Sequence, residues 1–201
     1  MIYVTTKKIE KDVDVEVLYE RFASSKDYID DILSRNNDDS KKQSLTALHA
    51  LLFLLDYVGE KTDGLVLARG TSGKPTINNG EWKFSVSHSS DYAVCGLSKT
   101  EIGVDLEKIR YMKNALPLAK RFFSSAEYDL MGKSSSDETF FKIWTKKEAY
   151  LKRRGWGIYT DLTKIDTSAQ TFATYAWNGY VMSVDGDGEI ETVGEIKWKR
   201  I

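Results

Sequence analysis

Two carboxylates stand at alternate positions in the run Gly103-Val104-Asp105-Leu106-Glu107. If this run is a strand, Val104 and Leu106 face a core, and Asp105 and Glu107 share the opposite face. Their backbones would then lie about 6.5–7 Å apart, which is near enough for both side chains to approach one ion. Gly103, on the same face, would leave room for a ligand. The alternative is that these residues form the solvated face of an ordinary edge strand.

A second set of residues follows a helical spacing. Trp144, Glu148 and Lys152 recur every four residues and share one helical stripe, with Phe141 one turn before. In this order Glu148 and Lys152 can form an ion pair worth only about 0.3–0.5 kcal/mol. A surface pair above an aromatic core residue is therefore the alternative to a functional site. Phe141 and Trp144 are expected to be buried, which would bring Glu148 and Lys152 toward the interior and favours a functional site.

One turn could bind an anion, whereas a glycine-rich loop does not match a known phosphate-binding motif. Ser87-His88-Ser89 groups hydroxyls and an imidazole at a strand end, which is typical of an anion-binding turn. A half-buried histidine bonded to the backbone is the alternative there. Gly73-Lys74-Pro75 lies in a glycine-rich loop, but it lacks the glycine spacing and the Ser/Thr of a phosphate-binding P-loop.

Composition limits the kinds of site. One cysteine, Cys95, and two histidines, His49 and His88, exclude a thiolate or multi-histidine metal centre, so any metal is a hard cation held by carboxylates. We expect His49 and Cys95 to be structural. The 29 basic and 30 acidic residues leave a net charge of −1, which argues against a nucleic-acid or membrane coat. The residues together predict a Mg²⁺-dependent enzyme that acts on a phosphate or pyrophosphate.

The elements that must position these residues give an α+β pattern. Hydrophobic periodicity and glycine stops predict helices over 41–57, 116–123 and 125–131, and a longer helix between an N-cap at Asp137 and a stop at Gly155. Alternation predicts strands over 82–88, 92–97 and 102–106. The tail is predicted to be a meander of strands over 172–177, 180–184 and 189–198, with a hairpin turn at Asn178-Gly179.

The order and spacing of the motifs resemble the 4′-phosphopantetheinyl transferase superfamily. The matching pieces are Gly73-Lys-Pro75, Phe84-Ser-Val-Ser-His-Ser89, Gly103-Val-Asp-Leu-Glu107, Arg121-Phe-Phe123 with Glu127, and Trp144-Thr-Lys-Lys-Glu-Ala-Tyr-Leu-Lys152. Each piece is weak alone, but the ordered set over residues 73–158 is specific. The chain length is similar to that of the Sfp-like single-chain branch rather than the shorter trimeric carrier-protein synthases.

This resemblance implies an α+β fold of two similar α/β halves, packed as an intramolecular pseudo-dimer of antiparallel sheets with flanking helices. Residues 1–98 would form the half that contacts the phosphate and adenine of coenzyme A. Residues 99–201 would carry the metal strand, the catalytic helix and the β meander.

The resemblance also implies an activity. The protein would transfer the 4′-phosphopantetheine arm of coenzyme A to a serine of an apo acyl or peptidyl carrier protein and release adenosine 3′,5′-bisphosphate. Asp105, Glu107 and Glu148 would hold Mg²⁺, or Mn²⁺. Glu148 would take the serine proton, and Lys152 would neutralise charge on the leaving phosphate.

Five further residues would bind coenzyme A. Ser87 and His88 would contact its phosphates, His88 the 3′-phosphate. Lys74 would border the adenine end, and Lys147 would contact a phosphate. Lys42 stands where the family usually has an arginine for the 3′-phosphate, and a lysine binds phosphate without the guanidinium fork.

The expected partner is a small acidic carrier protein. It would dock on a basic and apolar surface comprising Lys108, Arg110, Lys113, Lys120 and Arg121 with Tyr111, Met112, Leu116 and Phe122. The protein is expected to be monomeric and cytoplasmic, with no nucleic acid or membrane partner. Two alternatives stay open: a non-catalytic module that binds coenzyme A or a carrier protein, and a single-stranded nucleic-acid binder that uses the basic, aromatic segment 141–154.

Overall fold

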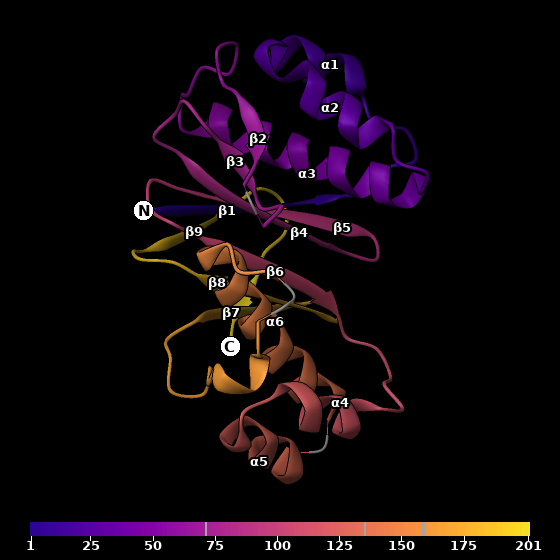
Figure 1. The fold of residues 1–201 in the computed structure, drawn as a ribbon, viewed down its shortest axis with the longest axis vertical. Helices are drawn as coiled ribbons and strands as arrows, with labels where there is room; N and C mark the ends of the chain where they lie inside the picture. Colours follow the sequence, from indigo (N-terminus) through magenta and orange to yellow (C-terminus); the bar gives the residue numbers. More distant parts are fainter. Residues whose placement is uncertain (71, 135, 158–159) are drawn as a thin grey trace.

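The computed structural model describes residues 1–70, 72–134, 136–157 and 160–201, so Ile158, which ends the motif run, lies outside them. The described chain forms two four-stranded sheets and a two-stranded hairpin, with helices packed against the sheets (Figure 1). The α helices, 3₁₀ helices (η) and strands are, in chain order, β1 (Ile2–Lys8), α1 (Val15–Arg21), η1 (Ala23–Ser25), α2 (Lys26–Leu33), α3 (Asp38–Tyr57), β2 (Leu67–Arg69), β3 (Pro75–Ile77), β4 (Lys83–Ser89), β5 (Tyr92–Ser98), β6 (Gly103–Lys108), α4 (Ala115–Phe122), α5 (Ser125–Ser134), α6 (Asp137–Arg154), η2 (Leu162–Lys164), β7 (Ala173–Trp177), β8 (Tyr180–Asp185), β9 (Ile190–Val193) and β10 (Lys199–Arg200). The predicted mixed class, with antiparallel sheets and flanking helices, is confirmed.

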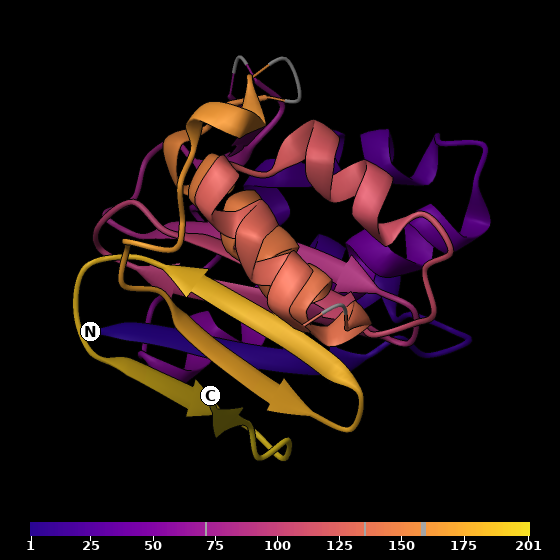
Figure 2. The same ribbon diagram turned by 90° about the horizontal axis from the view of Figure 1, so that it is seen from below.

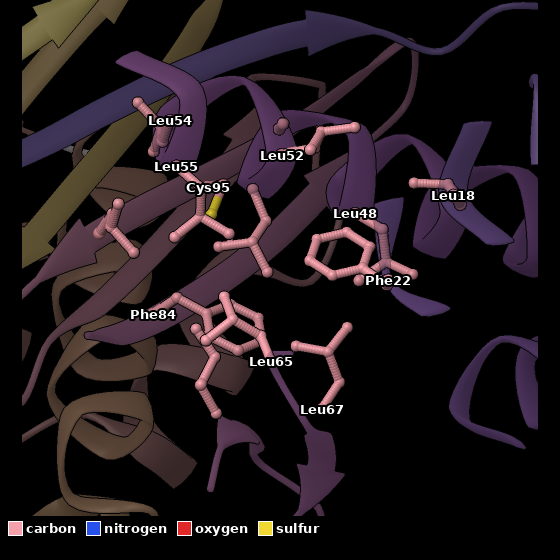
Figure 3. Packing of buried hydrophobic residues seen from close by; sticks show 14 of the residues in the cluster. Leu18, Phe22, Leu48, Leu52, Leu54, Leu55, Leu65, Leu67, Phe84 and Cys95 are labelled. Atoms are coloured by element: carbon pink, nitrogen blue, oxygen red, sulfur yellow. The ribbon is translucent and has the colours of Figure 1, made fainter. Parts of the chain in front are cut away.

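The first sheet has the strand order β4-β5-β1-β9 and is covered by α3 (Figure 1). The leucines of α3 pack against Phe84 of β4 and Cys95 of β5, and α1 and α2 close the outer side of this core (Figure 3). Cys95 is fully buried, and this burial raises the pKa of its thiol, so it is an unreactive core residue as predicted.

Helix α3 begins three residues earlier than the leucine periodicity indicated. The side chain of Asn37 accepts a hydrogen bond from Ser40 N and caps the first turn, where Asp38 and Asp39 complement the helix dipole. These polar residues carry no hydrophobic period, so the pattern used for the prediction did not include them.

The second sheet has the order β10-β7-β8-β6. Asn178 and Gly179 join β7 to β8 with φ values of 46° and 78°, a pair of positive angles that makes the predicted hairpin turn of the primed type. Figure 2 shows α6 lying across this sheet, where it contacts β6 and β8. The helix is capped by Ser136, whose side chain accepts from Thr139 N, rather than by Asp137 as predicted, and it ends at Gly155 in the left-handed conformation.

Gly103 allows the close approach of α6 to β6. A Cβ atom at this position would lie 1.9 Å from the carbonyl oxygen of Ala149 and 2.5 Å from Arg153 N. The space beside Gly103 is therefore filled by the helix backbone, and the expectation that it leaves room for a ligand is wrong.

The tail does not form one meander. After β8 the chain crosses to the first sheet, where β9 pairs in parallel with β1, and it returns to the second sheet as β10. The predicted single strand over 189–198 is thus wrong. The short apolar segments of the tail do not indicate which strand β9 will pair with. Its partner, β1, lies at the other end of the chain.

No helix in the described ranges is both long and apolar enough to cross a membrane.

Candidate functional site

The carboxylates of β6 lie where the two sheets meet. Val104 and Leu106 are buried in the core, as the alternation predicted, and Asp105 and Glu107 lie on the face toward α6. Asp105 is only 5% exposed, while Glu107 is half-buried. They do not form the solvated face of an exposed edge strand.

Lys152 of α6 reaches the first of these carboxylates. Its Nζ donates to Asp105 Oδ1 at 2.7 Å and to Ser87 Oγ at 2.8 Å. The Glu148–Lys152 pair, which the helical spacing suggested, does not appear among the ion pairs of the described residues. The packing of α6 on β6 brings Lys152 to a more deeply buried carboxylate.

Glu148 lies one helical turn before Lys152 and is half-buried. Burial raises the pKa of Glu148, and the charges of Asp105 and Glu107 raise it further, whereas Lys152 lowers it. All three predicted carboxylates are therefore close enough to influence one another electrostatically. A carboxyl group with a raised pKa is better matched to accept a proton near neutral pH.

The carboxylates have features that suit a divalent cation. Asp105 Oδ2 is the single buried side-chain oxygen or nitrogen, within the described residues, that has no hydrogen-bond partner. A buried anionic oxygen without a partner is costly, and Mg²⁺ prefers oxygen ligands of this kind. Across the same residues, no group of three or more His, Cys, Asp or Glu side chains is arranged so that it could hold a metal ion. The fit therefore rests on the chemistry of the carboxylates and on the unpartnered Oδ2, not on a complete set of protein ligands.

A cavity of about 300 Å³ lies beside this cluster, between the first sheet and α2 and α3. Its basic residues are Arg35, Arg69, His88 and Lys152. The pKa of His88 is lowered, first by desolvation and then by the positive charge of Lys152, with a smaller effect of Arg35. A cavity that holds a histidine among fixed cations is suited to a phosphate group.

The two arginines of this cavity, Arg35 and Arg69, lie outside every sequence motif. Both approach one carboxylate, since Asp31 Oδ2 lies 3.6 Å from Arg35 Nη2 and 3.4 Å from Arg69 Nη2. Arg69 also stacks on the Tyr28 ring, 5.0 Å from its centroid. Arg35 lies in a part of the chain without a recognisable motif. Arg69 is the last residue of β2, before the glycine-rich loop, and belongs to none of the motifs.

The structure places three predicted coenzyme A ligands elsewhere. Lys42 does not line the cavity, which α3 lines with Ser44, Ala47 and Leu48. The Nζ of Lys74 donates to Glu101 Oε2 at 2.8 Å and to the carbonyl oxygens of Ile102 and Arg153, both at 3.2 Å. These bonds use all three of its donors, so Lys74 joins β3 to the end of α6 and is not directed to a ligand.

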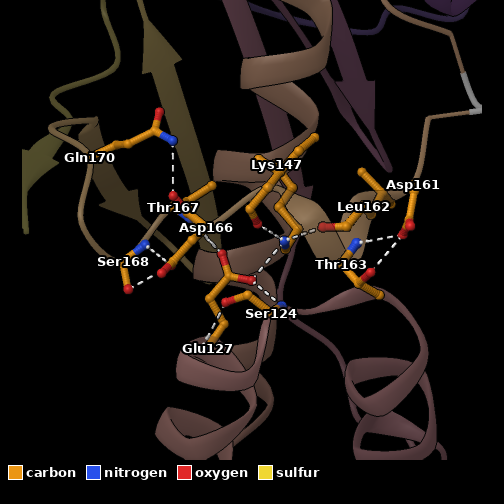
Figure 4. A network of polar contacts seen from close by, with 11 residues as sticks. Ser124, Glu127, Lys147, Asp161, Leu162, Thr163, Asp166, Thr167, Ser168 and Gln170 are labelled. Atoms are coloured by element: carbon orange, nitrogen blue, oxygen red, sulfur yellow. Dashed lines mark hydrogen bonds and ion pairs between the residues drawn. The ribbon is translucent and has the colours of Figure 1, made fainter.

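The structure does not support the prediction that Lys147 contacts a phosphate. Its side chain is fully buried, 2.7 Å from Glu127 Oε2, and donates to the carbonyl oxygens of Leu162 and Ile165 (Figure 4). Glu127 in turn accepts from Ser124 N and Thr167 N. Burial lowers the pKa of Lys147, and Glu127 opposes this effect. The pair connects α5 and α6 to the segment after η2.

Two aromatic residues of the basic helix pack inward, which disfavours the nucleic-acid alternative. Phe141 is 1% exposed, and Trp144 packs against Phe122 and Phe140. Single-strand binding needs aromatic faces on which bases can stack. Phe141 and Trp144 are instead part of the core with α4 and α5, whereas the half-buried Tyr150 packs against Trp156.

A larger cavity, of about 710 Å³, lies at the end of β1 and is lined by residues including Lys7, His49 and Phe53. It contains none of the predicted site residues. His49 there shares a hydrogen bond of 2.7 Å with the carbonyl oxygen of Asp14, which agrees with a structural histidine.

Comparison with known families agrees with the motifs. The model of the 4′-phosphopantetheinyl transferase superfamily matches residues 101–180, which include β6 and α6. The resemblance to this superfamily is therefore confirmed.

Curated relatives place the resemblance within the Sfp-like branch. The chain is 38% identical over 90 residues to the 4′-phosphopantetheinyl transferase Sfp of Bacillus subtilis, covering 43% of this chain and 39% of that protein. It is 39% identical over 111 residues to the transferase HetI of Nostoc sp., covering 51% and 46%. It is 27% identical over 148 residues to the transferase gsp of Aneurinibacillus migulanus, covering 71% and 61%. The aligned part of the chain thus spans about half the length of these relatives.

Proposed function

We propose that this protein transfers the 4′-phosphopantetheine arm of coenzyme A to a serine of an apo acyl or peptidyl carrier protein. The observation that carries the proposal is the contact of Lys152 with Asp105, next to Glu148 and a cation-lined cavity, in the segment that matches the superfamily. Carboxylates and cations of this kind are the groups that acid–base chemistry and phosphate binding require, which supports the proposal.

In the proposed reaction, the serine oxygen forms a bond to the phosphorus that carries pantetheine. The bond from that phosphorus to the bridging oxygen breaks, and adenosine 3′,5′-bisphosphate leaves. Glu148 accepts the serine proton, because it is the half-buried carboxylate one helical turn before Lys152. Lys152 supplies positive charge to the leaving phosphate.

Asp105, Glu107 and Glu148 would hold Mg²⁺, with Mn²⁺ as a substitute, and the unpartnered Asp105 Oδ2 supports this assignment. A bound divalent cation would neutralise the pyrophosphate of coenzyme A. Since Mg²⁺ usually keeps water and substrate phosphates in its coordination sphere, three protein carboxylates need not enclose it.

Arg35, Arg69 and His88 would bind the 3′-phosphate of coenzyme A in the cavity of about 300 Å³. This assignment replaces the predicted Lys42. The guanidinium groups supply the fork that a lysine lacks.

The finer architecture is also a proposal. We propose that residues 1–98 and 99–201 are similar halves of an intramolecular pseudo-dimer. In support, the order β4-β5-β1 with α3 between β1 and β4 is repeated as β7-β8-β6 with α6 between β6 and β7. The second half would then add β9 to the sheet of the first, and the site would lie between the halves.

The carrier protein would dock on the surface that follows β6. Tyr111 is 84% exposed and Leu116 is 44% exposed, beside the basic residues Lys113, Lys120 and Arg121. Arg110 pairs with Glu107 and stacks on Phe141, so it links this surface to the site. We propose a cytoplasmic monomer that meets an acidic carrier here.

The test is intact-mass spectrometry of apo carrier proteins incubated with the protein, coenzyme A and Mg²⁺. The expected result is a mass gain of one phosphopantetheine that EDTA abolishes. Fatty-acid, polyketide and peptidyl carriers are tested in parallel, so that the same experiment identifies the preferred carrier. The absence of any gain on all three types would overturn the proposal and favour a module that binds coenzyme A without transfer.

A further inference from the structure

Three serines of β4 face β6 although the two strands are edges of different sheets. Ser85 Oγ accepts from Val104 N at 3.0 Å, and Ser89 Oγ accepts from Lys108 N at 3.1 Å. Ser87 lies between them, with its Oγ 2.7 Å from Asp105 Oδ1. We call these three residues the serine seam. Their alternate spacing on β4 matches the alternate spacing of the two carboxylates on β6.

Two members of the serine seam donate to the two carboxylates. Ser87 donates to Asp105 Oδ1, and Ser89 donates to Glu107 Oε2 at 2.8 Å. A cation reaches the same oxygen in each case: Lys152 Nζ lies 2.7 Å from Asp105 Oδ1, and Arg110 Nη1 lies 3.1 Å from Glu107 Oε2.

The second oxygen of each carboxylate has no hydrogen-bond partner among the described residues. Asp105 Oδ2 is buried without a partner, and no hydrogen bond to Glu107 Oε1 is found within the described ranges. Each carboxylate is therefore held through one oxygen, while the other oxygen stays available.

We propose that Ser87 and Ser89 are positioning residues, which fix Asp105 and Glu107 so that one oxygen of each is directed to a divalent cation. This inference rests on the proposed function. It also changes the role expected for Ser87. A hydroxyl has one donor, and the donor of Ser87 is used on Asp105, while its oxygen accepts from Lys152. Ser87 thus acts through Asp105 rather than by donating to a coenzyme A phosphate.

The physical reason is the cost of orienting a free carboxylate. Without Ser87, the Asp105 side chain could rotate to direct both oxygens at Lys152, and cation binding would have to reverse this. Carboxylates that bind metals are commonly held by hydrogen bonds of this kind, and removing such a partner typically weakens metal affinity about 10- to 100-fold.

The experiment measures Mn²⁺ affinity by electron paramagnetic resonance, with and without coenzyme A, and without any carrier protein. The variants are Ser87→Ala and Ser89→Ala, with Ser85→Ala as the matched control. Ser85 joins the same two strands and is 2% exposed, but its contact is to a backbone N–H rather than a carboxylate. Ser87→Thr keeps the hydroxyl and tests rescue.

We expect Ser87→Ala and Ser89→Ala each to weaken Mn²⁺ binding about 10- to 100-fold. Ser85→Ala should lower the thermal midpoint of unfolding while leaving Mn²⁺ affinity within about twofold of wild type. Ser87→Thr should recover most of the Mn²⁺ affinity that Ser87→Ala loses. Wild-type affinity in both test variants, or an equal loss in Ser85→Ala, would overturn the inference. If the wild-type protein transfers phosphopantetheine but these serines leave Mn²⁺ affinity unchanged, the proposed function survives and only this inference fails. If wild type binds no Mn²⁺ even with coenzyme A, the proposed cation site fails as well.

Discussion

Lys152 Nζ lies 2.7 Å from Asp105 Oδ1, so a side chain of α6 is bound to the carboxylate strand β6 at the meeting point of the two sheets. The same Nζ donates to Ser87 Oγ of β4. One ammonium group thereby joins the helix to an edge strand of each sheet. The geometry of the site depends on the packing of α6, and this packing gives the first prediction.

Gly103→Ala should disrupt the site by displacing α6. The new Cβ would lie 1.9 Å from Ala149 O, and the backbone of a packed helix cannot move away cheaply. We expect a loss of about 1–3 kcal/mol or more in the free energy of unfolding, measured by urea denaturation. Gly132→Ala is the control. It meets nothing within 4 Å, and in a helix it should be neutral or stabilising by up to about 1 kcal/mol. Equal stability of the two variants would contradict the packing described.

Glu148→Gln should abolish transfer while the fold persists. The amide keeps the size of the side chain but cannot accept the serine proton, so we expect the rate to fall about 10²- to 10⁴-fold. The rate is measured by intact mass on an apo carrier, with circular dichroism as the check on folding. Glu138→Gln on the same helix, which loses only a surface pair with Lys142, should retain the rate. Unchanged turnover in Glu148→Gln would rule out its role as the base.

Arg35→Ala and Arg69→Ala should each raise the KM for coenzyme A. A hydrogen bond to a charged group contributes about 1.5–3 kcal/mol, which corresponds to a roughly 10- to 100-fold change. The effect should nearly vanish with 3′-dephospho-coenzyme A, because the lost contact is to the 3′-phosphate. Lys42→Ala should change the KM less, since this lysine does not line the cavity. If Lys42→Ala has the larger effect, the assignment made from sequence was correct.

Lys147→Met should destabilise the protein strongly. It leaves Glu127 charged and fully buried without its partner, and breaking a buried pair in this way costs about 3–5 kcal/mol. Lys142→Met removes the exposed pair with Glu138 and should cost less than about 1 kcal/mol. Both values come from denaturant unfolding. The double variant Glu127→Gln/Lys147→Met should recover part of the loss, because no buried charge is left unpaired.

His88 should titrate below the ordinary histidine pKa of about 6.5. Desolvation and then the charge of Lys152 disfavour its protonated form, with a smaller effect of Arg35, and these outweigh the opposing charge of Asp105. Proton NMR can follow its ring, and His88→Gln distinguishes it from His49, the other histidine. Lys152→Met and Arg35→Ala should each raise this pKa, and coenzyme A should raise it as well.

The same shift of the His88 pKa fixes the direction of its effect on stability. The pKa of His88 is lower in the folded protein than in the unfolded chain. When the pH falls below the pKa of the unfolded chain, the unfolded chain therefore binds more protons than the folded protein. His88 therefore reduces stability as the pH falls through about 6.5 and has no effect above it. A His88 pKa above 6.5 in the free protein would contradict the charge arrangement of the cavity.

Local patterns in the sequence determined the carboxylate strand, the helix with Glu148 and Lys152, and the Asn178-Gly179 turn. These features depend on periodicity and turn chemistry, which act between near neighbours, so residue spacing was sufficient to find them. The ordered motifs also pointed to the superfamily, because they preserve the residues that must meet at one site.

Only the tertiary structure decided which charges meet. Lys147 and Lys152 differ by five positions on one helix, yet one is fully buried against Glu127 and the other binds Asp105 beside a cavity. Spacing along a helix gives the direction of a side chain relative to the helix, but not the elements that pack around it. Arg35 reaches the cavity, Lys42 does not, and β9 crosses to the first sheet because long-range packing places them there. Such contacts join residues far apart in the chain, and no local pattern records them.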